Sequence, residues 1–147
     1  MLAKIKNILG TIAYWWRRFD AWFAGNAGLA VILGSLTFVR GVSYLPLFVN
    51  PDRKPAHFLE GVLPMDLNAI LWISVGLMAV YPALKQGRIL SVYVGIASGL
   101  HAAWGASFIL NSVFGVAERA WVSAIGYIGI VWLTYWGLKR INVTRRG

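Results

Sequence analysis

The sequence predicts an all-α integral membrane protein, in which an N-terminal amphipathic interfacial helix precedes four antiparallel transmembrane helices. The first reason is composition: of the 147 residues, 59% are apolar and 13% are charged, against roughly 45–50% and about 25% in soluble domains. A soluble domain of this length buries only about 70% of the surface of its chain, so this apolar content favours a bilayer. The other reasons are four long apolar segments and a one-sided distribution of basic residues.

Residues 1–24 form the predicted interfacial helix. Their apolar side chains recur at alternating spacings of three and four, which places them on one helical stripe. The stripe consists of Leu2, Ile5, Leu9, Ile12, Trp16, Phe19 and Phe23, opposite Lys4, Asn7, Thr11 and Arg18. Such a basic, tryptophan-rich amphipathic helix is typical of the headgroup plane, and packing on a protein partner is the alternative. A cleavable signal peptide fits this segment poorly, because Arg17 and Arg18 interrupt the apolar core that such a peptide needs.

Residues 27–138 form the predicted four-helix transmembrane domain. Its apolar segments cover about 27–48, 67–84, 89–114 and 120–138. Each holds 18 or more residues, close to the roughly 20 that cross about 30 Å of hydrocarbon. Prolines mark the polar loop at 49–63, and Pro64 precedes a helix start at Asp66. Short connections predict an antiparallel bundle, and residues 139–147 form a basic tail.

The basic residues indicate the orientation of the bundle. One side holds the single acid Asp20 and the ten bases Lys4, Lys6, Arg17, Arg18, Lys85, Arg88, Lys139, Arg140, Arg145 and Arg146. The other side is neutral, with Arg40, Arg53, Lys54 and Arg119 against Asp52, Glu60, Asp66 and Glu118. The positive-inside rule therefore predicts a multi-pass protein of the cell inner (plasma) membrane with both termini in the cytoplasm.

The expected partner of the basic side is the anionic headgroups of the bilayer, which attract each nearby base by about 1 kcal/mol. The expected headgroup contacts are Lys4, Arg17, Arg18, Lys85, Arg88, Lys139 and Arg140. Nucleic acid is not needed to explain the charge of +9. The other candidate partners are further copies of the chain or a larger membrane complex.

Small residues lie together on one face of the third apolar segment. Gly95 and Gly99 form a GxxxG motif, and Ala102 and Ala106 extend the same face. Such a face lets two helix backbones approach closely in lipid. It predicts either packing inside the bundle or a homo-oligomer seam.

Five polar residues fall within or at the ends of the apolar segments: Arg40, Asp66, Asn68, His101 and Asn111. A polar group at that depth needs a partner. For His101 we expect a neutral imidazole bonded to a backbone carbonyl of a neighbouring helix, the alternative being a proton-responsive or substrate-facing group. For Arg40 we expect a structural clamp with Asp66 or Glu60, the alternatives being snorkelling and a substrate site.

The aromatic residues divide into two predicted groups. Those near helix ends are expected at the membrane interface: Trp15, Trp16, Trp22, Tyr44, Phe48, Tyr81, Trp121 and Trp136. Trp72, Trp104 and Trp132 lie deeper in their segments and are expected to pack helices together.

Few residues are suited to catalysis or metal binding. The chain has no cysteine, five acids and two histidines. His57 and Glu60 have the spacing of two metal ligands, but structural zinc usually takes four. No nucleophile elbow, phosphate-binding glycine loop or zinc-protease motif occurs. We expect a protein that is not an enzyme and has no cofactor or metal site.

The stretch 104–127 reads WGASFILNSVFGVAERAWVSAIGY. It combines an apolar helix that begins with tryptophan, a short charged turn, and a helix that opens with Ala-Trp-Val-Ser. In these features it resembles small polytopic membrane proteins of actinobacterial bacteriophages, some of which are labelled holins. The resemblance implies a phage context. Many holins have two or three spans and a charged tail, and the four spans predicted for this chain differ from that pattern.

Three functions follow as hypotheses. The first is a holin-like oligomer that associates through Gly95 and Gly99 and permeabilises the inner membrane. The second is a binding partner in the host envelope, such as a superinfection-exclusion factor or an accessory subunit of a membrane complex. The third is a small carrier that uses His101 and the outer polar residues.

Overall fold

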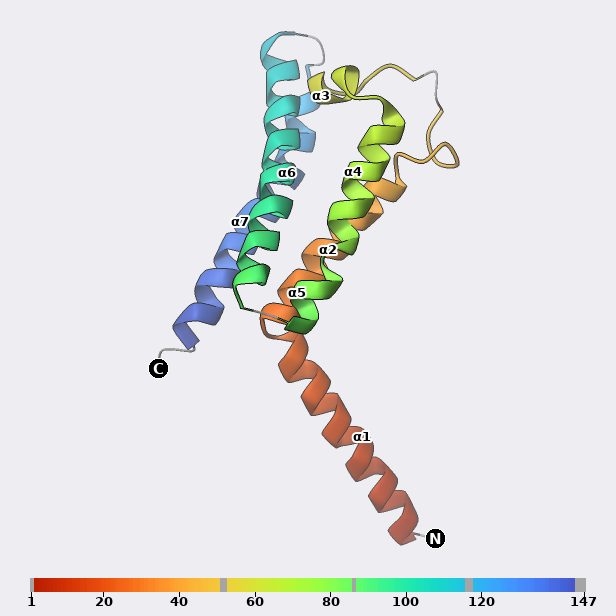
Figure 1. The fold of residues 1–147 in the computed structure, drawn as a ribbon, viewed down its shortest axis with the longest axis vertical. Coiled ribbons are helices and arrows are strands. Elements are labelled where there is room, and N and C mark those ends of the chain that lie inside the picture. Colours follow the sequence, from red (N-terminus) through yellow and green to blue (C-terminus); the bar gives the residue numbers. More distant parts are fainter. Residues whose placement is uncertain (1, 51–52, 86, 116–117, 145–147) are drawn as a thin grey trace.

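The computed structural model describes residues 2–50, 53–85, 87–115 and 118–144, and all regular secondary structure in these ranges is helical (Figure 1). The helices are α1 (Leu2–Phe23), α2 (Asn26–Val42), α3 (Phe58–Val62), α4 (Met65–Leu77), α5 (Val80–Lys85), α6 (Arg88–Val113) and α7 (Ala120–Thr144). The prediction of an all-α fold is confirmed.

The helices α2, α4, α5, α6 and α7 form the bundle. The most extensive contacts join α6 to α7 and α2 to α4. The short helix α3 covers one end of the bundle, beside the turn from α6 to α7, whereas α1 and the carboxyl end of α7 lie toward the opposite end (Figure 1). We call these the α3 end and the α1 end.

Three helical stretches are long and apolar enough to cross a membrane: Met65–Lys85, Arg88–Val113 and Ala120–Arg140. A fourth crossing results if Leu9–Phe23 and Ala27–Val42, which meet at a bend of 70°, form one broken span. The fold is therefore that of a multi-pass membrane protein with three or four crossings. The predicted segment 89–114 agrees with α6 to within one residue at each end.

The first apolar segment is helical over a shorter range than the predicted 27–48. Helix α2 has 17 residues and ends at Val42, which gives it a length of about 26 Å. Pro46 lacks an amide hydrogen and disfavours helical geometry in the residue before it, so the chain turns here. Tyr44, expected at the membrane interface, is instead only 2% exposed inside the bundle. That expectation was wrong.

The second apolar segment contains a break. Helix α4 ends at Leu77 and α5 begins at Val80. Pro82 has no amide hydrogen to donate to the carbonyl of Met78, and its ring crowds that carbonyl. The turn tightens locally, and the Ala79 amide donates to the Gly76 carbonyl at 3.2 Å.

The fourth helix extends into the predicted basic tail. Helix α7 continues to Thr144, so residues 139–144 belong to it, and 145–147 lie outside the described residues. No proline or glycine interrupts positions 138–144.

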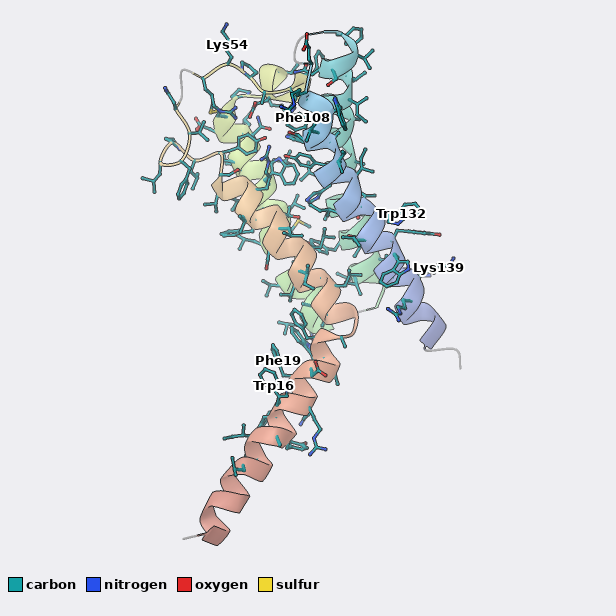
Figure 2. The ribbon with its side chains drawn as sticks, turned by 180° about the vertical axis from the view of Figure 1, so that it is seen from behind. Trp16, Phe19, Lys54, Phe108, Trp132 and Lys139 are labelled. Atoms are coloured by element: carbon teal, nitrogen blue, oxygen red, sulfur yellow. The ribbon has the colours of Figure 1, made fainter. Side chains whose placement is uncertain are left out.

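Helix α1 projects away from the bundle (Figure 1). Its side chains from Leu9 to Phe23 are all exposed, including Trp16 and Phe19, which lie outside the bundle in Figure 2. The predicted helix at 1–24 is therefore present. Its position in the headgroup plane stays a prediction.

Candidate functional site

Helix α3 is fastened to α6 by one serine. The Ser107 hydroxyl oxygen accepts the Leu59 amide at 2.9 Å and lies 2.9 Å from His57 Nδ1. His57 and Ser107 are 1% and 2% exposed. The His57 ring packs on Phe108, with centroids 4.3 Å apart, and Phe108 lies inside the α3 end of the bundle (Figure 2).

The histidine of this contact is neutral at neutral pH. Burial lowers the pKa of His57 to about 4, and Arg40 and Arg53 lower it as well, although Glu60 raises it. The Ser107 hydroxyl oxygen accepts the Leu59 amide, and the tautomer of the neutral imidazole decides whether Ser107 donates to His57 Nδ1 or accepts from it.

The loop before α3 is held by Glu60, which is 6% exposed. Its carboxylate forms an ion pair with Arg53 and accepts the Ala56 amide. Asn111 Nδ2 on α6 donates to the Ala56 carbonyl at 3.1 Å. His57 and Glu60 thus bond separate protein groups, and no group of three His, Cys, Asp or Glu among the described residues is placed to hold a metal ion.

Arg40 connects α2 to α7 without a carboxylate. Its guanidinium donates to the Tyr44 hydroxyl at 3.1 Å and lies 5.0 Å from the Tyr44 ring centroid and 5.2 Å from that of Tyr127. The expected partners were wrong: Glu60 pairs with Arg53, and Asp66 is exposed in the first turn of α4. The clamp consists of a hydroxyl and two ring faces, which attract a cation through their quadrupoles.

His101 is buried at 1% exposure. Its Nδ1 donates to the Ala97 carbonyl of its own helix at 2.8 Å, so the expectation of a carbonyl on a neighbouring helix was wrong. The edge-on ring of Trp72 lies 4.9 Å away between centroids. A carbonyl one turn earlier satisfies the imidazole without help from another helix.

Asn68 is fully buried near the start of α4. Its Nδ2 donates to the Leu63 carbonyl at 3.0 Å and to the Pro64 carbonyl at 3.4 Å. It therefore binds the chain that links α3 to α4. Arg40, Asn68 and Asn111 all act at the α3 end, whereas Asp66 takes no part in this cluster.

A groove runs between α2 and α7, with α6 as its floor. Its volume is about 370 Å³, and its lining residues are Leu36, Val39, Arg40, Ser43, His101, Ser123, Gly126, Tyr127 and Ile130. Of these, Arg40 and His101 were predicted as polar site residues, and Ser43, Ser123 and Tyr127 were not. The sequence signal that was available is the pair of serines near the ends of two apolar segments.

The predicted small-residue face lies on the outside of the bundle. Gly95, Gly99, Ala102 and Ala106 are exposed, and a Cβ added at Gly95 or Gly99 would meet nothing within 4 Å. The prediction that these residues pack inside the bundle is therefore wrong, and the alternative, a homo-oligomer seam, stays a prediction.

Other glycines pack α2 on α4. A Cβ at Gly76 would lie 2.6 Å from the backbone nitrogen of Phe38, and one at Gly41 would lie 2.5 Å from that of Ile73. These glycines allow close backbone approach between the two helices, the role that GxxxG motifs play in lipid.

The expected headgroup contacts are exposed where their side chains are described: Arg17, Arg18, Lys85, Arg88, Lys139 and Arg140. The Lys4 side chain lies outside the described residues. The turn between α5 and α6 and the end of α7 lie toward the α1 end (Figure 1). The Arg140 guanidinium lies 4.9 Å from the Trp136 ring centroid. The bases thus gather at the end predicted to be cytoplasmic.

The deep tryptophans differ in their environment. Trp72 and Trp104 are 0% and 3% exposed, with ring centroids 5.2 Å apart. Trp132 is 68% exposed on α7 (Figure 2), so the expectation that it packs helices within the chain was wrong.

Comparison with known proteins finds no matching family model, no matching curated protein and no matching solved structure.

Proposed function

We propose that the chain is a non-enzymatic protein of the inner membrane that crosses it four times, with both termini in the cytoplasm. In this proposal α2 forms the first crossing by itself, and α1 is not part of a broken span. Clustering of exposed bases at the α1 end supports this orientation under the positive-inside rule. The exposed, tryptophan-rich surface of α1 supports a position in the cytoplasmic headgroup plane.

Within this class we propose a holin-like function, in which several copies associate and permeabilise the membrane. The observation that carries the proposal is the open face of α6, where Gly95 and Gly99 have free space beside them. A second copy packed there would gain close backbone contact. The interior of one bundle is filled by side chains such as Trp72 and Trp104, so permeation requires more than one copy.

Timed expression in bacteria tests this function. The wild-type chain should collapse the membrane potential abruptly, as followed with a potential-sensitive dye. Gly99→Leu should delay the collapse because the larger side chain separates the two copies. Gly129→Leu on α7 is the matched control, since a Cβ at Gly129 also meets nothing within 4 Å. Equal timing in both variants would remove the α6 face from the mechanism.

The second candidate is an envelope binding partner that excludes superinfecting phage or serves a larger complex. The exposed α1 favours it, because a helix that leaves its own bundle can dock on another protein. Harmless expression combined with blocked entry of phage DNA would select this function over the holin-like one.

A further inference from the structure

We propose that the groove between α2 and α7 binds one anionic phospholipid from the leaflet at the α3 end. The lipid phosphate contacts Arg40, and an acyl chain follows the apolar wall of the groove. This inference stands apart from the holin-like function, because the groove and the α6 face use different residues.

The groove is polar at one end and apolar at the other. Ser43 directly follows the last residue of α2, and Ser123 lies in the first turn of α7. Leu36 and Ile130 line the groove seven residues further from the α3 end, about 10 Å along each helix axis. This arrangement follows that of a phospholipid, whose headgroup lies at the interface and whose acyl chain runs inward.

The charge at the polar end is positive. Among the described residues, no carboxylate lies within ion-pair distance of Arg40, since the carboxylate of Glu60 is paired with Arg53. The Nε atom of Arg40 is buried and has no hydrogen-bond partner there. A guanidinium at this depth is unfavourable unless paired, and its planar donors match phosphate oxygens. A phosphate would therefore supply the missing anion.

The shape of the groove admits such a ligand. Its volume of about 370 Å³ lies within the range of roughly 300–1,000 Å³ seen in small-molecule sites. Gly126 lines it without a side chain, and a Cβ there would meet nothing within 4 Å. A larger residue at 126 can therefore fill the groove and leave the packing of the bundle intact.

Native mass spectrometry of the purified full-length chain tests the site. The chain is titrated in neutral detergent with phosphatidylglycerol, phosphatidylcholine or inorganic phosphate. Gly126→Leu blocks the groove, and Gly129→Leu is the control, three residues along α7 and outside the lining. The bases at the α1 end are unchanged in both variants, so the difference between them reports the groove alone.

We expect one phosphatidylglycerol to bind the wild type and Gly129→Leu equally. It should bind Gly126→Leu roughly tenfold or more weakly, because the leucine fills the groove and keeps the phosphate from its charge-assisted contact with Arg40. Equal binding to Gly126→Leu, or equal binding of phosphatidylcholine by the wild type, would overturn the proposal. Binding of inorganic phosphate with the same variant dependence would make the ligand a free anion instead. Gly99→Leu should bind lipid normally, so failure here is distinct from failure of the holin-like function.

Discussion

Replacing Ser107 with alanine should release α3 from the bundle. The change removes the acceptor of the Leu59 amide and the hydrogen-bond partner of His57 Nδ1. Two hydrogen bonds at about 0.5–1.5 kcal/mol each give a loss of about 1–3 kcal/mol. Because the site is only 2% exposed, water replaces the lost partners poorly, which favours the upper half of this range.

Hydrogen exchange in detergent at neutral pH measures this loss directly. A destabilisation of about 2 kcal/mol should speed exchange of the Leu59 amide roughly 30-fold, if exchange follows local opening of α3. The control is Ser91→Ala, which lies on the exposed side of the same helix and should leave the Leu59 amide unchanged. Unaltered exchange in Ser107→Ala would refute the assignment of Ser107 as the attachment of α3.

Three further predictions concern the same bundle. The pKa of His57 is about 4 in the folded chain and about 6.5 in the unfolded chain, so the unfolded state binds more protons between these two values. The free energy of unfolding should therefore be constant above about pH 6.5 and fall by at most about 3 kcal/mol toward pH 4. In denaturant titrations, His57→Gln should abolish this dependence on pH. Gly76→Ala should lower the free energy of unfolding by about 1–3 kcal/mol, because α2 must shift to make room for the added methyl group. Gly99→Ala should leave it unchanged. Equal stability of the two variants would contradict the close contact between α2 and α4. Arg40→Ala should lower the folded yield in size-exclusion chromatography because the link between α2 and α7 is lost, and a fully stable variant that loses activity would show that Arg40 is not a clamp.

Hydrophobic length predicted the helices well because a long apolar segment has few alternatives in a bilayer. The segment 89–114 corresponds to α6 almost residue for residue. Local backbone chemistry caused the differences elsewhere: Pro46 stops α2 early, and Pro82 breaks the second segment. Hydropathy alone does not register these effects, because proline acts through a missing amide hydrogen and a clash.

The site was predicted only in part, because its contacts join residues that are distant in the chain. The polar residues Arg40, Asn68 and Asn111 were identified from their cost in a membrane. Their partners were not, since Ser107 lies 48 residues beyond Leu59 and the Tyr127 ring meets Arg40 only after folding. Whether the glycines of α6 face the inside or the outside of the bundle depends on which side of α6 packs against the other helices, and a small-residue motif alone does not specify that side.

In the proposed topology the chain crosses the membrane four times, with the α3 end outside and the α1 end in the cytoplasm. The chain has no cysteine, so single cysteines at Lys54, Lys85 and Lys139, all exposed, can be labelled with a membrane-impermeant maleimide in intact cells. We expect Lys54→Cys to react from outside, and Lys85→Cys and Lys139→Cys to react only after the cells are opened. Labelling of Lys54→Cys from the same side as the other two would contradict the account.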